Sequence, residues 1–328
     1  MENTMTRVLG RSGIAVSAMG LGCWAIGGPA YRGETPVGWG EVDDNESIRA
    51  IQRAVDLGVT FFDTANVYGA GHSEEVLGRA LAGRRQQVVI ATKFGNGILD
   101  QAARQIGGTF ATPAEIRQQC EESLRRLNIE TIDLYQFHLG SHPVEPVPYI
   151  LEVLEELVLA GKIRAYGWST DDPLRALAFS ERVHCAAMQF QCNVLNDNPD
   201  MVAMCEERNQ AAINRGPLAM GLLTGKYSTT DTLGVNDVRG AKSPPWMQYF
   251  KDGRPNPEWH EKVQAVRDVL TSGGRSLAQG ALAWLWARSP KMIPIPGFRT
   301  VKQVEENAAA MQFGPLTAAQ MEEIGGLL

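Results

Sequence analysis

The chain has 328 residues, of which 44% are hydrophobic and 21% are charged, and its formal net charge is -6 at pH 7. This acidic balance lacks the basic stripe that binding to a phosphate backbone requires, so we expect no nucleic-acid partner. No apolar run approaches the roughly 18 residues of a membrane span, and residues 1–6 lack a signal-peptide pattern, so we predict a cytoplasmic protein without a membrane partner.

Length and cysteine content narrow the fold class further. The composition is ordinary for a globular protein with a large core, and α/β barrels of about 250 residues or more fold as one unit. We therefore expect a single domain over residues 1–328. The five cysteines are odd in number and form no C-x-x-C pair, which argues against a disulfide framework and a zinc knuckle and predicts buried thiols.

The first 40 residues predict a small hairpin followed by one core strand. Residues 9–17 alternate around two glycines, which is typical of a hairpin, and we expect it to plug one end of a barrel. Residues 18–22 predict the first core strand. The Gly- and Trp-rich stretch 23–40 then predicts a loop at the rim of a pocket.

From Asp44 onward, helices and strands alternate regularly. Asp44 resembles a helix cap, and Ile48, Ile51 and Val55 follow at helical spacing. Apolar periodicity, Pro at first turns and Gly at helix ends predict helices at 44–57, 73–82, 113–127, 148–160, 173–182 and 200–209. Strands are predicted between them at 60–63, 88–93, 131–138, 164–169, 187–191 and 211–215. After a long loop to about residue 257, we expect helices at 258–272 and 276–289, a last strand at 292–294 and a covering helix at 317–328.

Eight strands that alternate with helices predict a closed (β/α)8 TIM barrel, with an N-terminal β-hairpin and extra C-terminal helices. An open dinucleotide-binding sheet would show a glycine fingerprint after a strand. The two near matches, at residues 20–22 and 69–71, lack the third glycine at the required place.

Reactive side chains end three consecutive predicted strands. Asp63, Lys93 and His138 close strands two, three and four, and Tyr68 follows strand two by one short loop. Because neighbouring strands lie ~4.8 Å apart, these four side chains can meet at the carboxyl end of the barrel. A single residue of any of these types more often has a structural role. Their joint placement at three consecutive strand ends favours a catalytic role instead. Lys93, held by Asp63, is expected to stabilise the Tyr68 phenolate, which makes Tyr68 a general acid for a carbonyl that His138 orients.

These four residues stand in the contexts Phe-Phe-Asp-Thr-Ala-x-x-Tyr-Gly, Ala-Thr-Lys and Tyr-Gln-Phe-His. The set resembles the catalytic tetrad of the aldo-keto reductases. The resemblance covers nearly the whole chain. The resemblance implies an NADPH-dependent reductase in which the nicotinamide delivers a hydride and Tyr68 delivers a proton. It also implies a small-molecule carbonyl substrate. The sequence specifies no oligomeric state.

The resemblance further implies the residues that bind the cofactor. The Gly-Trp-Ser-Thr turn resembles a family motif whose last two residues hold the nicotinamide carboxamide, with Thr170 in place of the family's Asn. Arg215 occupies the position of a nicotinamide-stacking aromatic residue. For the nicotinamide end, the implied residues are Gly22, Cys23, Trp24, Ser169, Thr170, Gln189 and Arg215. For the pyrophosphate loop they are Gly216, Pro217, Leu218, Gly221, Leu223, Gly225 and Lys226. For the adenosine 2'-phosphate end they are Gly297, Phe298, Arg299, Thr300, Gln303, Glu306 and Asn307.

Three alternatives remain open at this point. Lys93 at a strand end could form a Schiff base, as in aldolases of this fold. A metallohydrolase is weaker, because His138 and His142 form no ligand motif. A redox sensor that binds NADPH and turns over slowly is kept open by Arg215 and Thr170. The aromatic residues Trp24, Tyr31 and Trp39 and the segment 246–250 predict an apolar pocket rim.

Overall fold

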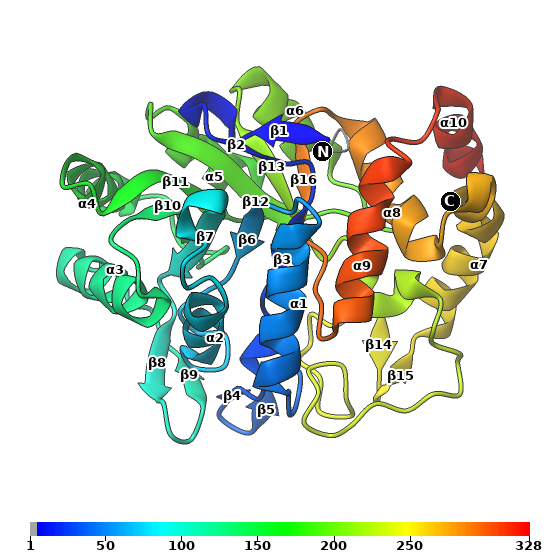
Figure 1. Ribbon diagram of the computed structural model, residues 1–328, viewed down its shortest axis with the longest axis horizontal. Helices are drawn as coiled ribbons and strands as arrows, with labels where there is room; N and C mark the ends of the chain where they lie inside the picture. The colour runs from blue at the N-terminus through cyan, green and yellow to red at the C-terminus, as the bar shows by residue number, and fades with distance from the viewer. Residues whose placement is uncertain (1–4) are drawn as a thin grey trace.

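The computed structural model describes residues 5–328, and a barrel of parallel strands forms its centre (Figure 1). The first four residues, part of the segment 1–6 considered above, lie outside the described residues. Within residues 5–328 the central sheet contains eight strands in the order β16-β13-β12-β11-β10-β7-β6-β3. The N–H of Gly22 donates to the Pro296 carbonyl at 3.0 Å, and Gly22 pairs with Gly297, so the two edges meet and the predicted barrel closes.

The eight barrel strands agree closely with the predicted positions. Neighbouring strands in the order β16 to β3 run parallel, so all carboxyl ends face the same side. Their bounds are β3 (Gly20–Gly22), β6 (Phe61–Asp63), β7 (Val89–Phe94), β10 (Ile132–Phe137), β11 (Ile163–Ser169), β12 (Cys185–Gln191), β13 (Ala211–Arg215) and β16 (Met292–Pro294).

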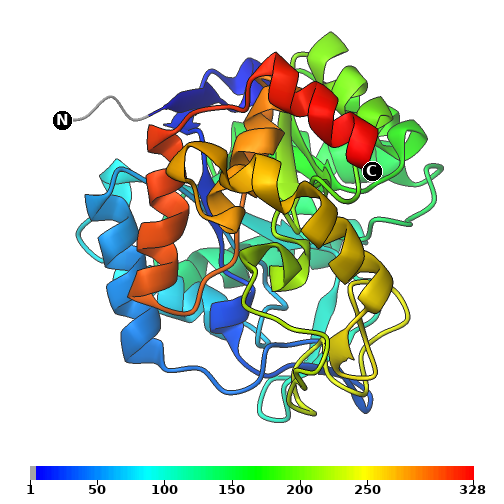
Figure 2. The ribbon, with the colours of Figure 1, turned by 90° about the vertical axis from the view of Figure 1, so that its right-hand side faces the viewer.

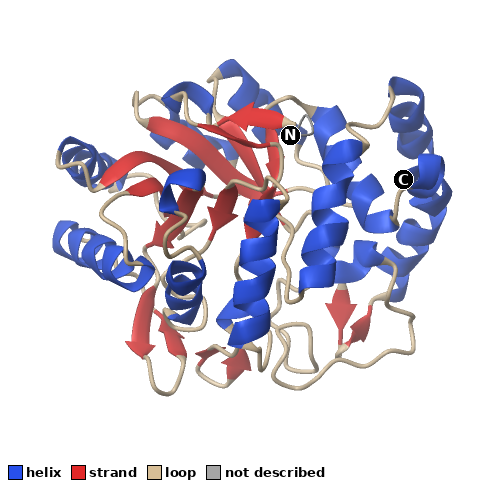
Figure 3. Cartoon of the chain, viewed as in Figure 1, coloured by secondary structure: helices blue, strands red, loops and turns tan. Residues whose placement is uncertain are grey.

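Helices surround this sheet (Figure 3). The surrounding helices are α1 (Asp44–Asp56), α2 (His72–Ala80), α3 (Pro113–Leu127), α4 (Val147–Leu159), α5 (Pro173–Ser180), α6 (Pro199–Glu207), α8 (Leu277–Arg288) and α9 (Val301–Ala309). The extra helices α7 (Pro257–Thr271) and α10 (Ala318–Leu327) pack on each other and on α8 (Figure 2). Among residues 5–328, none of the helices combines the length and apolar character needed to span a membrane.

Local sequence explains where the helices begin. In α3, Thr112 accepts from the Glu115 N–H and the Glu115 side chain bonds back to Thr112, a capping box followed by Pro113 at the first helical position. The prediction that Asp44 caps α1 is wrong by one residue. Asp43 has the extended backbone of a cap and accepts two N–H groups, whereas Asp44 is already helical and its carboxylate bonds to His72 and Arg79.

The predicted N-terminal hairpin closes the amino end of the barrel. Strands β1 (Thr6–Val8) and β2 (Ala15–Ser17) pair antiparallel around the short helix η1 (Gly10–Ser12). Leu9, Ile14 and Val16 are buried against side chains inside the barrel, including Phe61 and Leu134. The hairpin therefore acts as the expected plug, and it leaves the opposite, carboxyl end for a binding site.

Loops at the carboxyl end form a roof that the sequence did not predict in detail. Part of it is a four-stranded sheet in the order β5-β4-β9-β8, made of β4 (Tyr31–Arg32), β5 (Thr35–Pro36), β8 (Gly97–Asp100) and β9 (Gln105–Gly107). The segment 216–256 forms the rest, with η4 (Ala219–Thr224) and the hairpin β14 (Phe250–Lys251) and β15 (Arg254–Pro255). In Figure 1 the small strands lie at the bottom, opposite the β1–β2 hairpin.

Candidate active site and cofactor cavity

A cavity of about 720 Å³ lies between the carboxyl ends of the barrel strands and the roof. Many of the residues proposed from the sequence line it. From the predicted tetrad these are Asp63, Tyr68 and His138, and from the predicted cofactor residues they are Gly22, Trp24, Ser169, Gln189, Arg215, Gly216, Pro217, Leu218, Gly221, Lys226, Gly297, Phe298, Arg299 and Gln303.

Lys93 lies directly beneath the cavity floor, fully buried. Its Nζ donates to Asp63 Oδ1 at 2.5 Å, to the Thr64 carbonyl at 2.8 Å and to Tyr68 Oη at 3.2 Å. These three acceptors use all three ammonium protons, so the amine cannot rotate freely. The predicted meeting of Asp63, Tyr68 and Lys93 at adjacent strand ends is therefore present in the structure.

Two glutamines complete the environment of Asp63. Its second oxygen, Oδ2, accepts from Gln136 Nε2 and from Gln189 Nε2, each at 2.8 Å. Gln136 was not among the residues predicted from the sequence. A signal was available: residues 136 and 138 point to the same face of a strand, so a polar residue two positions before His138 faces the same site.

Burial and neighbouring groups together set the pKa values of Lys93 and Tyr68. Desolvation alone would lower the pKa of Lys93, but the charge of Asp63 and the contact with Tyr68 raise it above its usual value. Burial raises the pKa of Tyr68, and the nearby Lys93 opposes this only in part. The expectation that Lys93 would make the phenol more acidic thus holds for its own contribution but not for the sum, because burial outweighs that contribution and the charge of Asp63 adds to the effect of burial. At neutral pH the site contains a protonated phenol beside a protonated amine.

His138 is a neutral imidazole. Burial lowers its pKa well below the usual value, and the positive charges of Lys93, Arg215 and Arg32 add to this. Its Nδ1 is buried without a hydrogen-bond partner among residues 5–328. The ring meets the Tyr68 ring edge-on, with centroids 5.9 Å apart. Because Nδ1 is buried and His138 lines the cavity, Nε2 is the ring nitrogen that can bond to a molecule there.

The chemistry of two polar groups in the wall fits a nicotinamide carboxamide. Within residues 5–328, the Ser169 hydroxyl and the Gln189 side-chain oxygen line the cavity without a hydrogen-bond partner, while the Gln189 amide nitrogen is held by Asp63 and by Gln136 at 3.1 Å. A hydroxyl that donates and an amide oxygen that accepts match the two ends of a carboxamide. These two groups are therefore free to bond to a molecule in the cavity, which is compatible with the predicted role of Ser169 and Gln189.

The other end of the cavity carries positive charge suited to phosphates. The Arg299 guanidinium donates to the carbonyl of Trp39 at 3.2 Å and to that of Glu41, and it forms no ion pair with an acid in the described part of the chain. Lys226 also lines the cavity beside the turn of η4, where Met220 and Gly221 have positive φ. Uncompensated cations of this kind suit phosphate groups.

Seven of the predicted cofactor residues do not line the cavity. Thr170 is buried and its hydroxyl donates to the Gly140 carbonyl at 2.8 Å, so it supports the loop behind the wall. Thr300 caps α9 by accepting from the Gln303 N–H at 3.3 Å. The seven are Cys23, Thr170, Leu223, Gly225, Thr300, Glu306 and Asn307.

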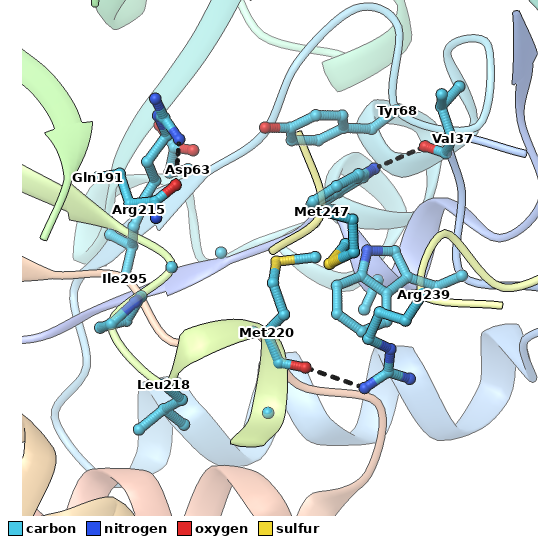
Figure 4. Close-up of a pocket in the computed structure, with 18 of the residues that line it drawn as sticks. Val37, Asp63, Tyr68, Gln191, Arg215, Leu218, Met220, Arg239, Met247 and Ile295 are labelled. Atoms are coloured by element: carbon cyan, nitrogen blue, oxygen red, sulfur yellow. Dashed lines mark hydrogen bonds between the residues drawn. The ribbon is translucent and has the colours of Figure 1, made fainter. Parts of the chain in front are cut away.

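Arg215, at the end of β13, does not act as a free cation. Its guanidinium pairs with Asp171. It also donates to Gln191 Oε1 at 3.2 Å, and Figure 4 shows Arg215 and Gln191 side by side. Its side chain is 37% exposed and that of Asp171 is 50% exposed. The charge expected beside the nicotinamide is therefore largely compensated at the rim.

The roof contains a buried cation that the sequence analysis missed. Arg239 donates to both oxygens of Asp237, to the Met220 carbonyl at 3.0 Å and to Tyr227 Oη at 2.8 Å. Its guanidinium lies 4.4 Å from the centre of the Trp39 ring. Figure 4 shows Arg239 reaching Met220 at the edge of the cavity. Arg239 thus joins three separate stretches of the roof.

The structure also bears on the alternatives. A Schiff base requires a neutral amine, and the raised pKa of Lys93 opposes that role. All five cysteines are buried and free, as predicted. Across residues 5–328 the structure contains no group of three His, Cys, Asp or Glu side chains placed to hold a metal ion.

Comparisons with known proteins identify the family of this chain. A family model described as the aldo/keto reductase family matches residues 18–328. The chain is 33% identical over 305 residues to aldo-keto reductase YhdN of Bacillus subtilis, covering 90% of this chain and 85% of the relative. It is 31% identical over 330 residues to aldo-keto reductase yakc [NADP(+)] of Schizosaccharomyces pombe, covering 97% and 90%.

Among solved structures, the glycerol dehydrogenase AKR11B4 from Gluconobacter oxydans matches with a TM-score of 0.83 and 32% identity, covering 100% of this chain and 96% of that one. The holo form of an aldo-keto reductase from Bacillus halodurans matches with a TM-score of 0.78 and 28% identity, covering 99% and 96%. The family model and these relatives extend over nearly the whole chain, and the chain belongs to the aldo/keto reductase family.

Proposed function

We propose that this protein is an NADPH-dependent reductase that converts aldehydes and ketones to alcohols, with Tyr68 as the general acid. The observation that carries the proposal is the position of the Tyr68 hydroxyl, which faces the cavity and lies 3.2 Å from the buried Lys93 ammonium. NADPH is supported by the relative from Schizosaccharomyces pombe that is named for NADP(+) and by a 25% identical structure from Klebsiella pneumoniae, TM-score 0.70, in complex with NADP and acetate.

NADPH, when bound, supplies the hydride that reduces the carbonyl carbon. Ser169 and Gln189 would hold its carboxamide, and Lys226 and Arg299 would supply positive charge for its phosphates. His138 donates a hydrogen bond from Nε2 to the carbonyl oxygen and so orients the substrate. As negative charge develops on that oxygen, Tyr68 transfers its proton to it, and Lys93 stabilises the phenolate that remains. The products are the alcohol and the oxidised cofactor. We also predict one domain over residues 1–328 and a cytoplasmic location.

The decisive experiment replaces Tyr68 with Phe and follows NADPH oxidation with 4-nitrobenzaldehyde. Loss of the proton donor should lower kcat by about 10²- to 10⁴-fold, the usual contribution of general acid catalysis. NADPH binding, measured by quenching of tryptophan fluorescence, should stay unchanged because the hydroxyl does not hold the cofactor. Tyr149→Phe is the matched control, since Tyr149 is exposed on α4, is not among the residues that line the cavity, and should keep full activity when changed. Full activity in Tyr68→Phe would refute the assigned role.

An NADPH-binding redox sensor with slow turnover is the competing function. It differs in one measurable respect, which is catalysis across a broad panel of aldehydes and ketones. Tight NADPH binding without turnover of any panel member would replace the proposed reductase by the sensor.

A further inference from the structure

One cation in the cavity wall has no acidic partner among residues 5–328 and is not one of the residues assigned to the cofactor. Arg32 lies in β4 of the small roof sheet and lines the cavity. Its Nη2 donates to Asn96 Oδ1 at 3.2 Å, and within residues 5–328 it forms no ion pair. By contrast, Arg215 pairs with Asp171 and Arg239 pairs with Asp237. The Arg32 charge is therefore available to a molecule in the cavity.

One buried amide, that of Asn96, anchors the solvent-exposed Arg32 near His138. Asn96 is only 8% exposed, and its Nδ2 donates to the carbonyl of His138 at 3.0 Å. Its own carbonyl accepts from Asn66 Nδ2 at 2.8 Å, and Asn66 is itself buried. Arg32 is thus two hydrogen bonds away from the backbone of His138. The Arg32 charge is also one of those that lower the pKa of His138, which agrees with this proximity.

The other uncompensated cations belong to a different part of the wall. Lys226 follows η4, and Arg299 precedes α9 and reaches the carbonyls of residues 39 and 41. Those two lie where the phosphates of the cofactor are assigned. Arg32 is carried by the small sheet instead, and near it the wall is formed by the side chains of Val37 from the β4–β5 hairpin and Ile106 from β9.

The surrounding surface is apolar. Trp24, Val37, Ile106, Leu139 and Trp246 line the same cavity, so a substrate body on this side meets hydrocarbon and aromatic rings. A guanidinium at the edge of an apolar surface matches a molecule with an apolar body and one anionic group, because its planar fork can donate two parallel hydrogen bonds to a carboxylate.

We propose that Arg32 is a specificity-determining residue that selects carbonyl substrates bearing a carboxylate on an apolar or aromatic body, remote from the carbonyl. This inference rests on the proposed reductase function and adds the class of substrate. The carboxylate binds the Arg32 guanidinium beside Asn96, and the carbonyl end then lies between Tyr68 and His138.

The test compares two substrates of nearly equal shape, 4-carboxybenzaldehyde and methyl 4-formylbenzoate, which differ in charge. The unmodified enzyme should reduce the carboxylate with a kcat/KM about ten- to a hundredfold higher, as expected for charged hydrogen bonds. Arg32→Gln should remove this preference by raising KM for the carboxylate, while its kinetics with the ester stay within about twofold. Arg32→Lys should keep part of the preference because it retains the charge but loses the fork.

Arg49→Gln is the matched control, since it removes the same charge from an exposed face of α1 and should leave the preference intact. Equal reduction of both aldehydes by the unmodified enzyme, or a preference that survives in Arg32→Gln, would overturn the inference while leaving the reductase function in place. Reduction of neither aldehyde, nor of 4-nitrobenzaldehyde, would count against the proposed function itself.

Discussion

The floor and the roof of the cavity each contain one buried cation with the same three kinds of partner. In the floor, Lys93 contacts the Asp63 carboxylate, the Thr64 carbonyl and the Tyr68 phenol. In the roof, Arg239 contacts the Asp237 carboxylate, the Met220 carbonyl and the Tyr227 phenol. The two residue types suit different tasks, because lysine presents a compact charge and arginine a rigid planar fork.

The difference lies in what each cation is attached to. Lys93 and Asp63 sit on neighbouring barrel strands whose backbones are already paired, so the floor keeps its shape without them. Arg239 connects loop segments joined by only a short stretch of backbone pairing, in which the Val238 N–H donates to the Gly38 carbonyl at 2.7 Å, and it also stacks on Trp39. We therefore expect damage to the floor to abolish the chemistry, and damage to the roof to loosen the cofactor while sparing the chemistry.

Replacing Lys93 with Met should have the largest effect. The variant loses the charge that stabilises the Tyr68 phenolate, so kcat with 4-nitrobenzaldehyde should fall by about 10²- to 10⁴-fold. It also leaves Asp63 as a buried charge without its ion-pair partner, which should lower the free energy of unfolding by about 3–5 kcal/mol, measured by urea denaturation.

The double variant Asp63→Asn with Lys93→Met separates these two losses. Since it removes both charges, most of the lost stability should return while the enzyme stays inactive. A double variant as unstable as the single one would show that the charge imbalance is not the cause.

Replacing Arg239 with Gln should have the next largest effect, on the cofactor. The roof loses its connection between Met220, Tyr227 and Trp39, so the segment 226–256 should open more often and be cleaved faster by trypsin. We expect the Kd of NADPH to rise by about tenfold or more, part of the cost of breaking a buried ion pair. The kcat at saturating NADPH should fall by less than about threefold. A large loss of kcat with unchanged NADPH affinity would remove the distinction between roof and floor.

The residues of the floor could be predicted from the sequence more fully than those of the roof, for a physical reason. The floor residues end consecutive strands, and strand ends in a parallel barrel converge by geometry, so Asp63, Lys93 and His138 could be placed together from spacing alone. The roof depends on contacts between distant segments. Trp39 and Arg239 are 200 positions apart in a stretch without periodicity, and β4 pairs with β9 across more than 70 residues. No local pattern encodes these contacts.

The net shift in the pKa of Tyr68, which sums opposing electrostatic effects, also could not be predicted from the sequence. Lys93 beside Tyr68 correctly suggested a contribution that favours the phenolate. Whether that contribution exceeds the cost of burial depends on how deeply both side chains lie and on Asp63, and the structure shows that burial dominates. Thr170 is a similar case, because only the position of the Gly140 carbonyl shows that its hydroxyl is already used.

The floor should also show a pH-dependent stability that the roof lacks. The pKa of His138 is lowered in the folded protein by burial and by Lys93, so below about pH 6.5 the unfolded chain binds a proton that the folded protein does not. Stability is therefore full above pH 6.5 and falls as the pH drops. His138 contributes up to about 1.4 kcal/mol per pH unit in that range. Urea unfolding between pH 5 and 8 should show a shallower slope in His138→Gln, and identical slopes would contradict the assignment.

The smallest effect is expected at the rim, where Arg215 and Asp171 form an ion pair whose side chains are 37% and 50% exposed. Solvent screens such a pair, so Asp171→Asn should change the free energy of unfolding by less than about 1 kcal/mol. The kcat/KM for a neutral aldehyde should change by less than about threefold, measured beside Lys93→Met and Arg239→Gln. The rim pair has the same charges as the floor and roof pairs, so burial is the variable that separates the three. A loss at Asp171 as large as at Lys93 would mean that charge pairing rather than burial sets the ranking, and it would assign Arg215 a direct part in the chemistry.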